Sequence, residues 1–133
     1  MLIPTNGAYM DKPTILYIDD EPDALKAISL GLQDRGFNVM TASSGAQGLE
    51  ILHKVTINLI ITDLRMQPMN GFELFQEVKK IKKNKKTPFF FLTAVNDSLA
   101  EKYGQKLGID AYITKPVDLD DLVLAIQNKL AAR

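Results

Sequence analysis

Short apolar runs alternate along this chain with longer segments in which apolar residues recur every three or four positions. Continuous apolar runs of a few residues are typical of buried β-strands, and a spacing of three or four is typical of amphipathic helices. The first pattern predicts strands over 14–19, 37–42, 57–62, 88–94 and 111–114. The second predicts helices over 22–36, 43–54 and 97–108, one that begins at Gly71 and one that follows Asp118. Strand and helix therefore alternate from end to end, without an internal repeat or a linker.

Three of the predicted strands consist mainly of consecutive apolar residues rather than alternating between apolar and polar ones: "TILYI", "INLIIT" and "PFFFL". Continuous apolar strands are expected where helices cover both faces of a parallel sheet. Alternating strands and helices, joined by right-handed crossovers, give a three-layer α/β sandwich. We therefore predict a (βα)5 α/β fold. In such folds ligands bind at the carboxyl ends of the strands, so the residues at those ends are the first candidates for a functional site.

Charged and hydroxyl side chains gather at these predicted strand ends. Asp19 ends the first predicted strand and Asp20 comes next. Asp63 comes directly after the third strand, Thr93 lies at the end of the fourth and Lys115 follows the fifth. Carboxylates that share one edge of a sheet repel one another unless a cation joins them. A lysine and a divalent ion together balance three carboxylates. Because the candidate ligands are all oxygens, the sequence predicts Mg²⁺ or Mn²⁺ rather than Zn²⁺.

A carboxylate can also act as a nucleophile toward phosphorus and form an aspartyl phosphate. Phosphoryl transfer depends mainly on positioning and on neutralising the charge of the transferred group. Asp63 is the best candidate nucleophile because it stands alone at the end of a predicted central strand, while Lys115 and Thr93 can neutralise phosphoryl oxygens. A single aspartate at a strand end is more often a turn or cap residue. The joint placement of acids, hydroxyl and lysine on one edge favours the functional interpretation.

Composition narrows the alternatives further. The chain has 133 residues, no cysteine, one histidine, and sixteen basic against sixteen acidic residues. These numbers exclude disulfides, thiolate chemistry and histidine-cluster metal sites, and the neutral balance gives no argument for nucleic acid or an anionic membrane as partner. No apolar run approaches the length of a membrane span, and the first residues lack the features of a signal peptide. We expect residues 1–12 to be a flexible extension and 13–133 to be one domain.

Four motifs together carry a family resemblance: "YIDDEPD", "IITDLRMQPMNG", "FLTA" and "YITKP". With them the chain resembles the receiver domain of two-component response regulators, over about residues 13–130. The resemblance implies a flavodoxin-like fold with a five-stranded parallel sheet of order 2-1-3-4-5. It also implies a cytoplasmic signalling switch that catalyses only its own phosphotransfer and dephosphorylation, and not an enzyme in the ordinary sense.

The resemblance further implies a role for each matching residue. Asp63 would be the phosphorylation site and a metal ligand. Asp19 and Asp20 would be the metal acids, with Asp20 preferred as the direct ligand, and the backbone carbonyl of Arg65 would be a further ligand. Lys115 would pair with the phosphoryl oxygens. The implied cofactor is Mg²⁺ or Mn²⁺.

A two-state switch is also implied. Thr93 would be the hydroxyl that turns toward the phosphoryl group, and Tyr112 would be the aromatic residue that then moves inward. The surface of the fourth helix (97–108), fifth strand (111–114) and fifth helix would change as a result. The implied partners are a histidine kinase or phosphotransfer protein, an output domain or downstream protein, and, through that surface, a second copy of the chain. Nucleic acid and membrane are not expected as partners.

Two features depart from the family pattern or lie outside it. The family places Met-Pro at the third and fourth positions after the phosphoacceptor, whereas this chain has Met66 and Gln67 there, with Pro68 one position later. The segment "KKIKKNKK" (79–86) holds six lysines. We interpret it as a solvated helix end whose charges complement the helix dipole, with a docking patch for an acidic partner as the alternative.

Other functions remain open at this stage. A flavodoxin-like cofactor binder shares the predicted fold but needs a phosphate loop where this chain has Asp19–Asp20–Glu21. A haloacid-dehalogenase-type phosphatase carries its nucleophile in a D-x-D pattern after the first strand, and here the acids are adjacent. A receiver that only binds partners, without phosphate, is a third alternative. Whether the domain acts alone or belongs to a larger protein also stays open.

Overall fold

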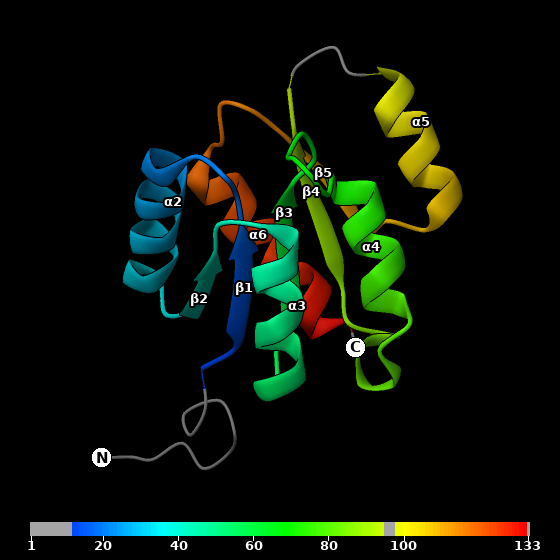
Figure 1. The fold of residues 1–133 in the computed structure, drawn as a ribbon. Helices are drawn as coiled ribbons and strands as arrows, with labels where there is room; N and C mark the ends of the chain where they lie inside the picture. Colours follow the sequence, from blue (N-terminus) through cyan, green and yellow to red (C-terminus); the bar gives the residue numbers. More distant parts are fainter. Residues whose placement is uncertain (1–11, 95–97, 133) are drawn as a thin grey trace.

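Five parallel strands form one sheet in the order β2-β1-β3-β4-β5 (Figure 1). The computed structural model describes residues 12–94 and 98–132. The strands are β1 (Thr14–Ile18), β2 (Asn38–Ala42), β3 (Leu59–Asp63), β4 (Phe89–Thr93) and β5 (Ala111–Thr114). The predicted strands and their order are thereby confirmed. The predicted extension over 1–12 falls almost wholly on residues 1–11, which lie outside the described part of the chain.

Helices cover both faces of the sheet, as a three-layer sandwich requires (Figure 1). They are α2 (Pro22–Asp34), α3 (Gly45–Lys54), α4 (Gly71–Lys79), α5 (Ser98–Leu107) and α6 (Leu119–Ala131), with a short 3₁₀ turn, η1 (Lys82–Asn84), after α4. Leucines of α3 and α4 join the apolar cluster on one face, together with Ala100 of α5. Leu32 of α2 and Leu122 of α6 join the cluster on the other face. The predicted (βα)5 flavodoxin-like fold is confirmed.

Local sequence signals explain where the helices begin. The Ser44 hydroxyl accepts a hydrogen bond from the Gln47 backbone N–H at the start of α3. Asn70 and Glu73 form a reciprocal capping box at the start of α4, and Asp118 caps α6 by accepting from the Asp121 backbone N–H. Each cap satisfies a backbone donor that has no partner within its helix. These caps place the loops before α4 and α6, which flank the carboxyl edge of the sheet.

The central strands are the most deeply buried elements. Every residue of β3 and β4 is buried, Asp63 and Thr93 included. The edge strand β5 is only partly buried. The predicted β3 ended at residue 62, but the strand includes Asp63, whose partner in the ladder is Leu92 of β4. The carboxylate therefore stands on a rigid, hydrogen-bonded position rather than in a loop.

The lysine-rich segment differs from its predicted form. Helix α4 ends at Lys79 and the chain then turns through η1, so residues 80–86 do not extend a helix. The Lys79 ammonium donates hydrogen bonds to the carbonyls of Asn84, Lys85 and Thr87, at 3.3, 3.0 and 3.0 Å. Burial lowers the pKa of Lys79. The prediction of a solvated helix end is wrong for Lys79, whose ammonium stabilises the turn. The other lysines of the segment are exposed, among them Lys82, Lys83, Lys85 and Lys86.

None of the helices in the described part of the chain has the length and apolar character needed to cross a bilayer.

Candidate functional site

Three carboxylates meet at the carboxyl edge of the sheet. One oxygen from each of Asp19, Asp20 and Asp63 lies within 4.8 Å of the others. Asp19 and Asp20 follow β1, and Asp63 ends β3, which pairs directly with β1. Parallel pairing of these two strands therefore brings together acids more than forty positions apart in the sequence. Asp19 and Asp63 are buried, whereas Asp20 is exposed.

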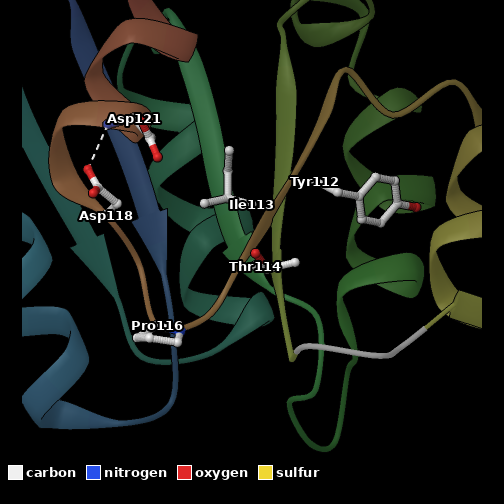
Figure 2. Close-up of a pocket in the computed structure, with 6 residues that line it drawn as sticks. All are labelled: Tyr112, Ile113, Thr114, Pro116, Asp118 and Asp121. Carbon is white, nitrogen blue, oxygen red and sulfur yellow. Dashed lines mark hydrogen bonds between the residues drawn. The ribbon is translucent and has the colours of Figure 1, made fainter.

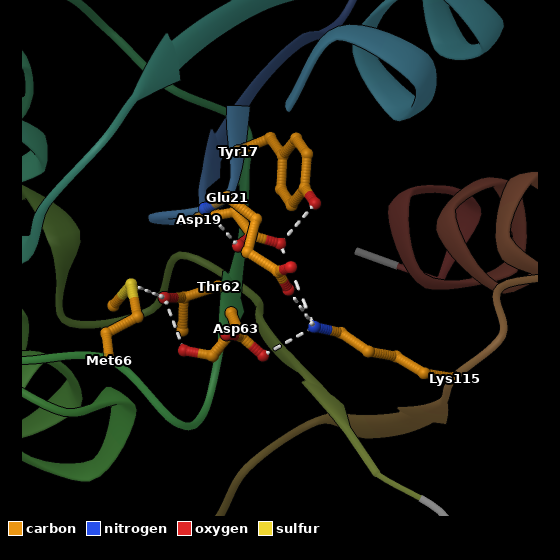
Figure 3. Close-up of polar contacts among 7 residues, drawn as sticks. All are labelled: Tyr17, Asp19, Glu21, Thr62, Asp63, Met66 and Lys115. Carbon is orange, nitrogen blue, oxygen red and sulfur yellow. Dashed lines mark hydrogen bonds and ion pairs between the residues drawn. The ribbon is translucent and has the colours of Figure 1, made fainter. Parts of the chain in front are cut away.

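Lys115 reaches into the carboxylate cluster from the loop after β5 (Figure 3). Its ammonium lies 2.9 Å from Asp63 Oδ1, and 3.9 Å from both Asp19 Oδ2 and Glu21 Oε1. The Lys115 backbone N–H donates to the carbonyl of Thr93 at 2.8 Å, which fastens the start of this loop to the end of β4. The predicted pairing of acids and lysine at one edge is therefore present in the structure.

The charges in this site do not balance. Burial raises the pKa of Asp63, and the neighbouring Asp19 and Asp20 raise it further, while the hydrogen bond and charge of Lys115 act against them. Burial alone would lower the pKa of Lys115, but its hydrogen bond to Asp63 and the surrounding carboxylates leave that pKa raised. Three carboxylates and one ammonium leave two negative charges. A divalent cation fits this deficit, and the all-oxygen donor set fits Mg²⁺ or Mn²⁺.

Tyr17 contacts the acidic cluster, and the sequence interpretation did not include it in the site. Its hydroxyl donates a hydrogen bond of 2.7 Å to Asp19 Oδ2, and both side chains are fully buried (Figure 3). Burial and this bond to Asp19 raise the pKa of Tyr17. The Glu21 backbone N–H donates to the other Asp19 oxygen at 3.0 Å. Protein donors thus hold both oxygens of Asp19, which leaves the exposed Asp20 as the better placed direct ligand for an ion.

A signal for Tyr17 was present in the sequence. Residues two apart on a strand point to the same face, so a tyrosine two positions before an acid can reach it. The phenol occupies a position that otherwise belongs to an apolar strand. A buried phenol needs a hydrogen-bond partner, and the nearest acid was the candidate.

We predict that Tyr17→Phe destabilises the fold by about 1.5–3 kcal/mol, because the buried Asp19 carboxylate loses a charge-assisted hydrogen bond. Urea unfolding in the presence of a chelator measures this change without a contribution from metal. Tyr103→Phe is the matched control: Tyr103 is 46% exposed, and its ring contact with Phe72 survives the substitution. Equal stabilities of Tyr17→Phe and this control would contradict the role of the Tyr17 hydroxyl.

The remaining candidate residues lie around the cluster rather than within it. Thr93 is buried at the end of β4, beside the strand that carries Asp63. Arg65 is exposed in the loop after β3, two positions beyond Asp63. Tyr112 lies on β5 and packs toward α5, and its hydroxyl donates to the Ala100 carbonyl at 3.2 Å. The structure therefore separates the acidic pocket from the predicted switch aromatic.

The loop with the unusual proline closes tightly over the strand end. The Gly71 backbone N–H donates to the Leu64 carbonyl at 2.9 Å, and a Cβ at Gly71 would lie 3.0 Å from Leu64 Cα and 3.1 Å from the Asp63 carbonyl. Met66 is buried, and its sulfur lies 4.0 Å from the Thr62 hydroxyl. The Gln67–Pro68 peptide is cis. A side chain at position 71 would therefore require the backbone of Asp63 and Leu64 to shift by a few tenths of an ångström, and glycine lets the loop close without that shift.

Fold and site together define an α/β protein with an acidic pocket at the carboxyl edge of a flavodoxin-like sheet, whose three carboxylates have the spacing of a metal-ligand set. The family model described as "Response regulator receiver domain" matches residues 15–127. The chain belongs to this family, whose members are signalling switches of two-component systems rather than classical enzymes. The flavodoxin-like cofactor binder and the haloacid-dehalogenase-type phosphatase are therefore set aside.

Individual relatives agree with this assignment. The chain is 40% identical over 119 residues to the transcriptional regulatory protein GlrR of Escherichia coli, a match that covers 87% of this chain and 26% of that protein. The chain thus spans about a quarter of that relative. An uncharacterised 14.6 kDa protein of Leptolyngbya boryana is 32% identical over 113 residues, which cover 85% of this chain and 86% of that protein. The receiver domain structure from Clostridium thermocellum superposes with a TM-score of 0.84 at 34% identity, covering 90% and 95% of the two chains.

Proposed function

We propose that Asp63 accepts a phosphoryl group from a phosphohistidine of a partner histidine kinase or phosphotransfer protein. An Asp63 carboxylate oxygen bonds to phosphorus as the P–N bond of the phosphohistidine breaks, and the departing imidazole takes up a proton. The observation that carries this proposal is the 2.9 Å contact between the Lys115 ammonium and Asp63 Oδ1, beside acids that can share one metal ion with Asp63. We expect the exchange to take place in the cytoplasm.

The proposed cofactor is Mg²⁺ or Mn²⁺, held by Asp19, Asp20, Asp63 and the backbone carbonyl of Arg65. When bound, such an ion neutralises phosphoryl oxygens and so lowers the cost of bringing a dianion to an acidic pocket. The chain's own residues do the rest. Tyr17 orients Asp19, Lys115 pairs with a phosphoryl oxygen, and Thr93 donates its hydroxyl to another.

The proposed consequence of phosphorylation is a change in the surface that β5 forms with α5 and α6. Thr93 turns toward the phosphoryl group, Tyr112 occupies the space that this opens, and the face formed by α5, β5 and α6 changes shape. A near-complete reversal of such an equilibrium needs about 5.5 kcal/mol of differential binding. A phosphoryl dianion that gains several charge-assisted hydrogen bonds in one state is a reasonable source of that energy.

The proposed readers of this face are an output domain or downstream protein, and a second copy of the chain. Relatives named as transcriptional regulators, GlrR among them, support an output of gene control for proteins of this family. The face lies on the edge strand β5, whose partly buried residues leave apolar surface for a partner. In this proposal the receiver itself contacts protein and not nucleic acid.

Labelling by a small phosphodonor tests the proposal. We predict that acetyl phosphate with Mg²⁺ labels the purified chain, and that a chelator reduces the labelling rate at least tenfold, because two uncompensated negative charges then repel the donor. Intact-mass spectrometry measures the fraction that gains one phosphoryl group. The absence of label with Mg²⁺ present would instead favour a receiver that binds its partners without phosphate.

A further inference from the structure

Gly104 lies in the middle of α5, where a glycine is unexpected. Glycine in a helix interior is less favourable than alanine, so its presence needs a reason. Two other glycines, Gly36 and Gly108, adopt positive φ angles of 94° and 86° and have open space around the missing side chain. Gly104 shows the opposite combination: its φ is ordinary, and its surroundings are filled. The backbone conformation at position 104 is open to any residue, but the neighbouring atoms leave no room for a side chain there.

The space beside Gly104 is taken by Tyr112. A Cβ added at Gly104 would overlap the Tyr112 hydroxyl oxygen and Cζ, and would lie 3.1 Å from Cε2. The Tyr112 hydroxyl donates to the carbonyl of Ala100, which is one helical turn before Gly104. In Figure 2 the Tyr112 ring extends from β5 toward α5, on the side of the strand opposite to Ile113. Gly104 and Ala100 therefore form a seat on α5 for the end of the tyrosine ring.

The seat is connected to the strand that carries Thr93. The Tyr112 ring packs edge-on against Phe91, with 5.6 Å between ring centroids, and Phe91 is two positions before Thr93 on β4. Tyr112 is the ladder partner of Phe91, and Thr114 is the partner of Thr93. Movement of the Tyr112 ring out of the seat therefore changes its packing against Phe91. The position of Tyr112 is thus linked to the end of β4 through its packing against Phe91.

We propose that Gly104 is the positioning residue for Tyr112. The missing side chain at 104 creates the seat on α5, so the residue at this position decides whether Tyr112 can keep the position against α5 that it has in this structure. Because that position is coupled to the phosphoryl site, residue 104 also sets the bias of the switch. The seat for Tyr112 exists independently of the proposed function, whereas the bias of the switch rests on that function.

Gly104→Ala is the direct test. The overlapping atoms are the free end of a side chain, so rotation of Tyr112 away from α5 relieves the overlap while α5 gains a better helix former. We expect nuclear Overhauser contacts from the Tyr112 ring to Phe91 and residue 104 in the unaltered chain, and their loss in Gly104→Ala. Retention of these contacts in the variant would overturn the proposal, as would their absence from the unaltered chain.

The second readout is the affinity for beryllofluoride, a phosphoryl mimic, measured with Mg²⁺. Coupled sites commonly affect each other 5–150-fold, and the effect is reciprocal. We expect Gly104→Ala to weaken this binding at least about fivefold. Gln105→Ala, an exposed position on the same helix, controls for helix propensity and should change the affinity less than about twofold. An unchanged or tighter affinity in Gly104→Ala would overturn the link to the switch.

A double-variant comparison covers the case in which Gly104→Ala folds poorly. With Tyr112→Ala the seat is empty, so the double variant should be more thermally stable than Gly104→Ala alone. Its beryllofluoride affinity should stay within about twofold of that of Tyr112→Ala alone. Failure to restore stability would overturn the proposal. Failure of the unaltered chain to bind beryllofluoride would count against the proposed function, while the ring contacts would still decide whether the seat exists.

Discussion

Asp63→Asn should abolish labelling of the chain by acetyl phosphate. The amide is neutral and a poor nucleophile, so the step that forms an acyl phosphate has no acceptor. The geometry argues that no neighbour replaces it: Asp63 Oδ1 is the oxygen at 2.9 Å from the Lys115 ammonium, whereas Asp19 Oδ2 lies 3.9 Å from that ammonium and is held by Tyr17. Intact-mass spectrometry over a time course with Mg²⁺ measures the loss.

Asp23→Asn is the matched control for this experiment. Asp23 is an exposed acid in the first turn of α2, outside the carboxylate cluster, so the substitution removes the same charge without altering the site. We expect the control to label at the rate of the unaltered chain. Circular dichroism should show that Asp63→Asn keeps its fold. An Asp63→Asn variant that labels as fast as the control would refute the assignment of the phosphoacceptor.

Asp20→Asn should weaken Mg²⁺ binding at least tenfold. Asp20 contributes one of the three oxygens within 4.8 Å of each other, and its exposure lets it be changed without disturbing the core. Even groups that only orient metal ligands affect metal affinity about 10–100-fold, so the loss of a direct ligand should be at least as large. Isothermal titration calorimetry with Mg²⁺ or Mn²⁺ measures the change.

The same variant separates metal binding from phosphoryl acceptance. At saturating Mg²⁺, Asp20→Asn should recover most of its labelling, because Asp63 and Lys115 are unchanged. Asp23→Asn again serves as the control and should bind metal normally. If Asp20→Asn binds metal as tightly as the control, the three-carboxylate site is not where the ion binds.

The fold and the centre of the site could be predicted from the sequence because both follow from short-range patterns. The apolar runs around Ile60 and Phe90 predict buried parallel strands, and parallel strands necessarily bring their carboxyl ends to one edge. Asp63 and Lys115 are therefore expected to lie near each other at this edge, as the structure confirms. The precise end of β3 was missed by one residue, since aspartate is a poor strand former and the ladder with β4 overrides that preference.

Other features depend on contacts that local patterns do not encode. The role of Lys79 follows from the path of the chain through η1, which folds three carbonyls around its ammonium. In the sequence, Gly104 indicates either a mobile helix or a tight packing contact, and the pattern does not identify the neighbour, because Tyr112 comes from another element. The spacing of two between Tyr17 and Asp19 was enough to predict that their side chains can meet. The prediction was missed because the strand is otherwise mainly apolar, a pattern that favours a core position for Tyr17.

The most direct test of phosphoryl acceptance is to locate the phosphoryl group. The chain is labelled with acetyl phosphate and Mg²⁺, the acyl phosphate is reduced with borohydride, which converts a phosphorylated aspartate to homoserine, and the peptides are mapped by mass spectrometry. We predict homoserine at position 63 and at no other aspartate. Homoserine at Asp19 or Asp20 with Asp63 intact, or label retained on His53, would contradict the proposed function.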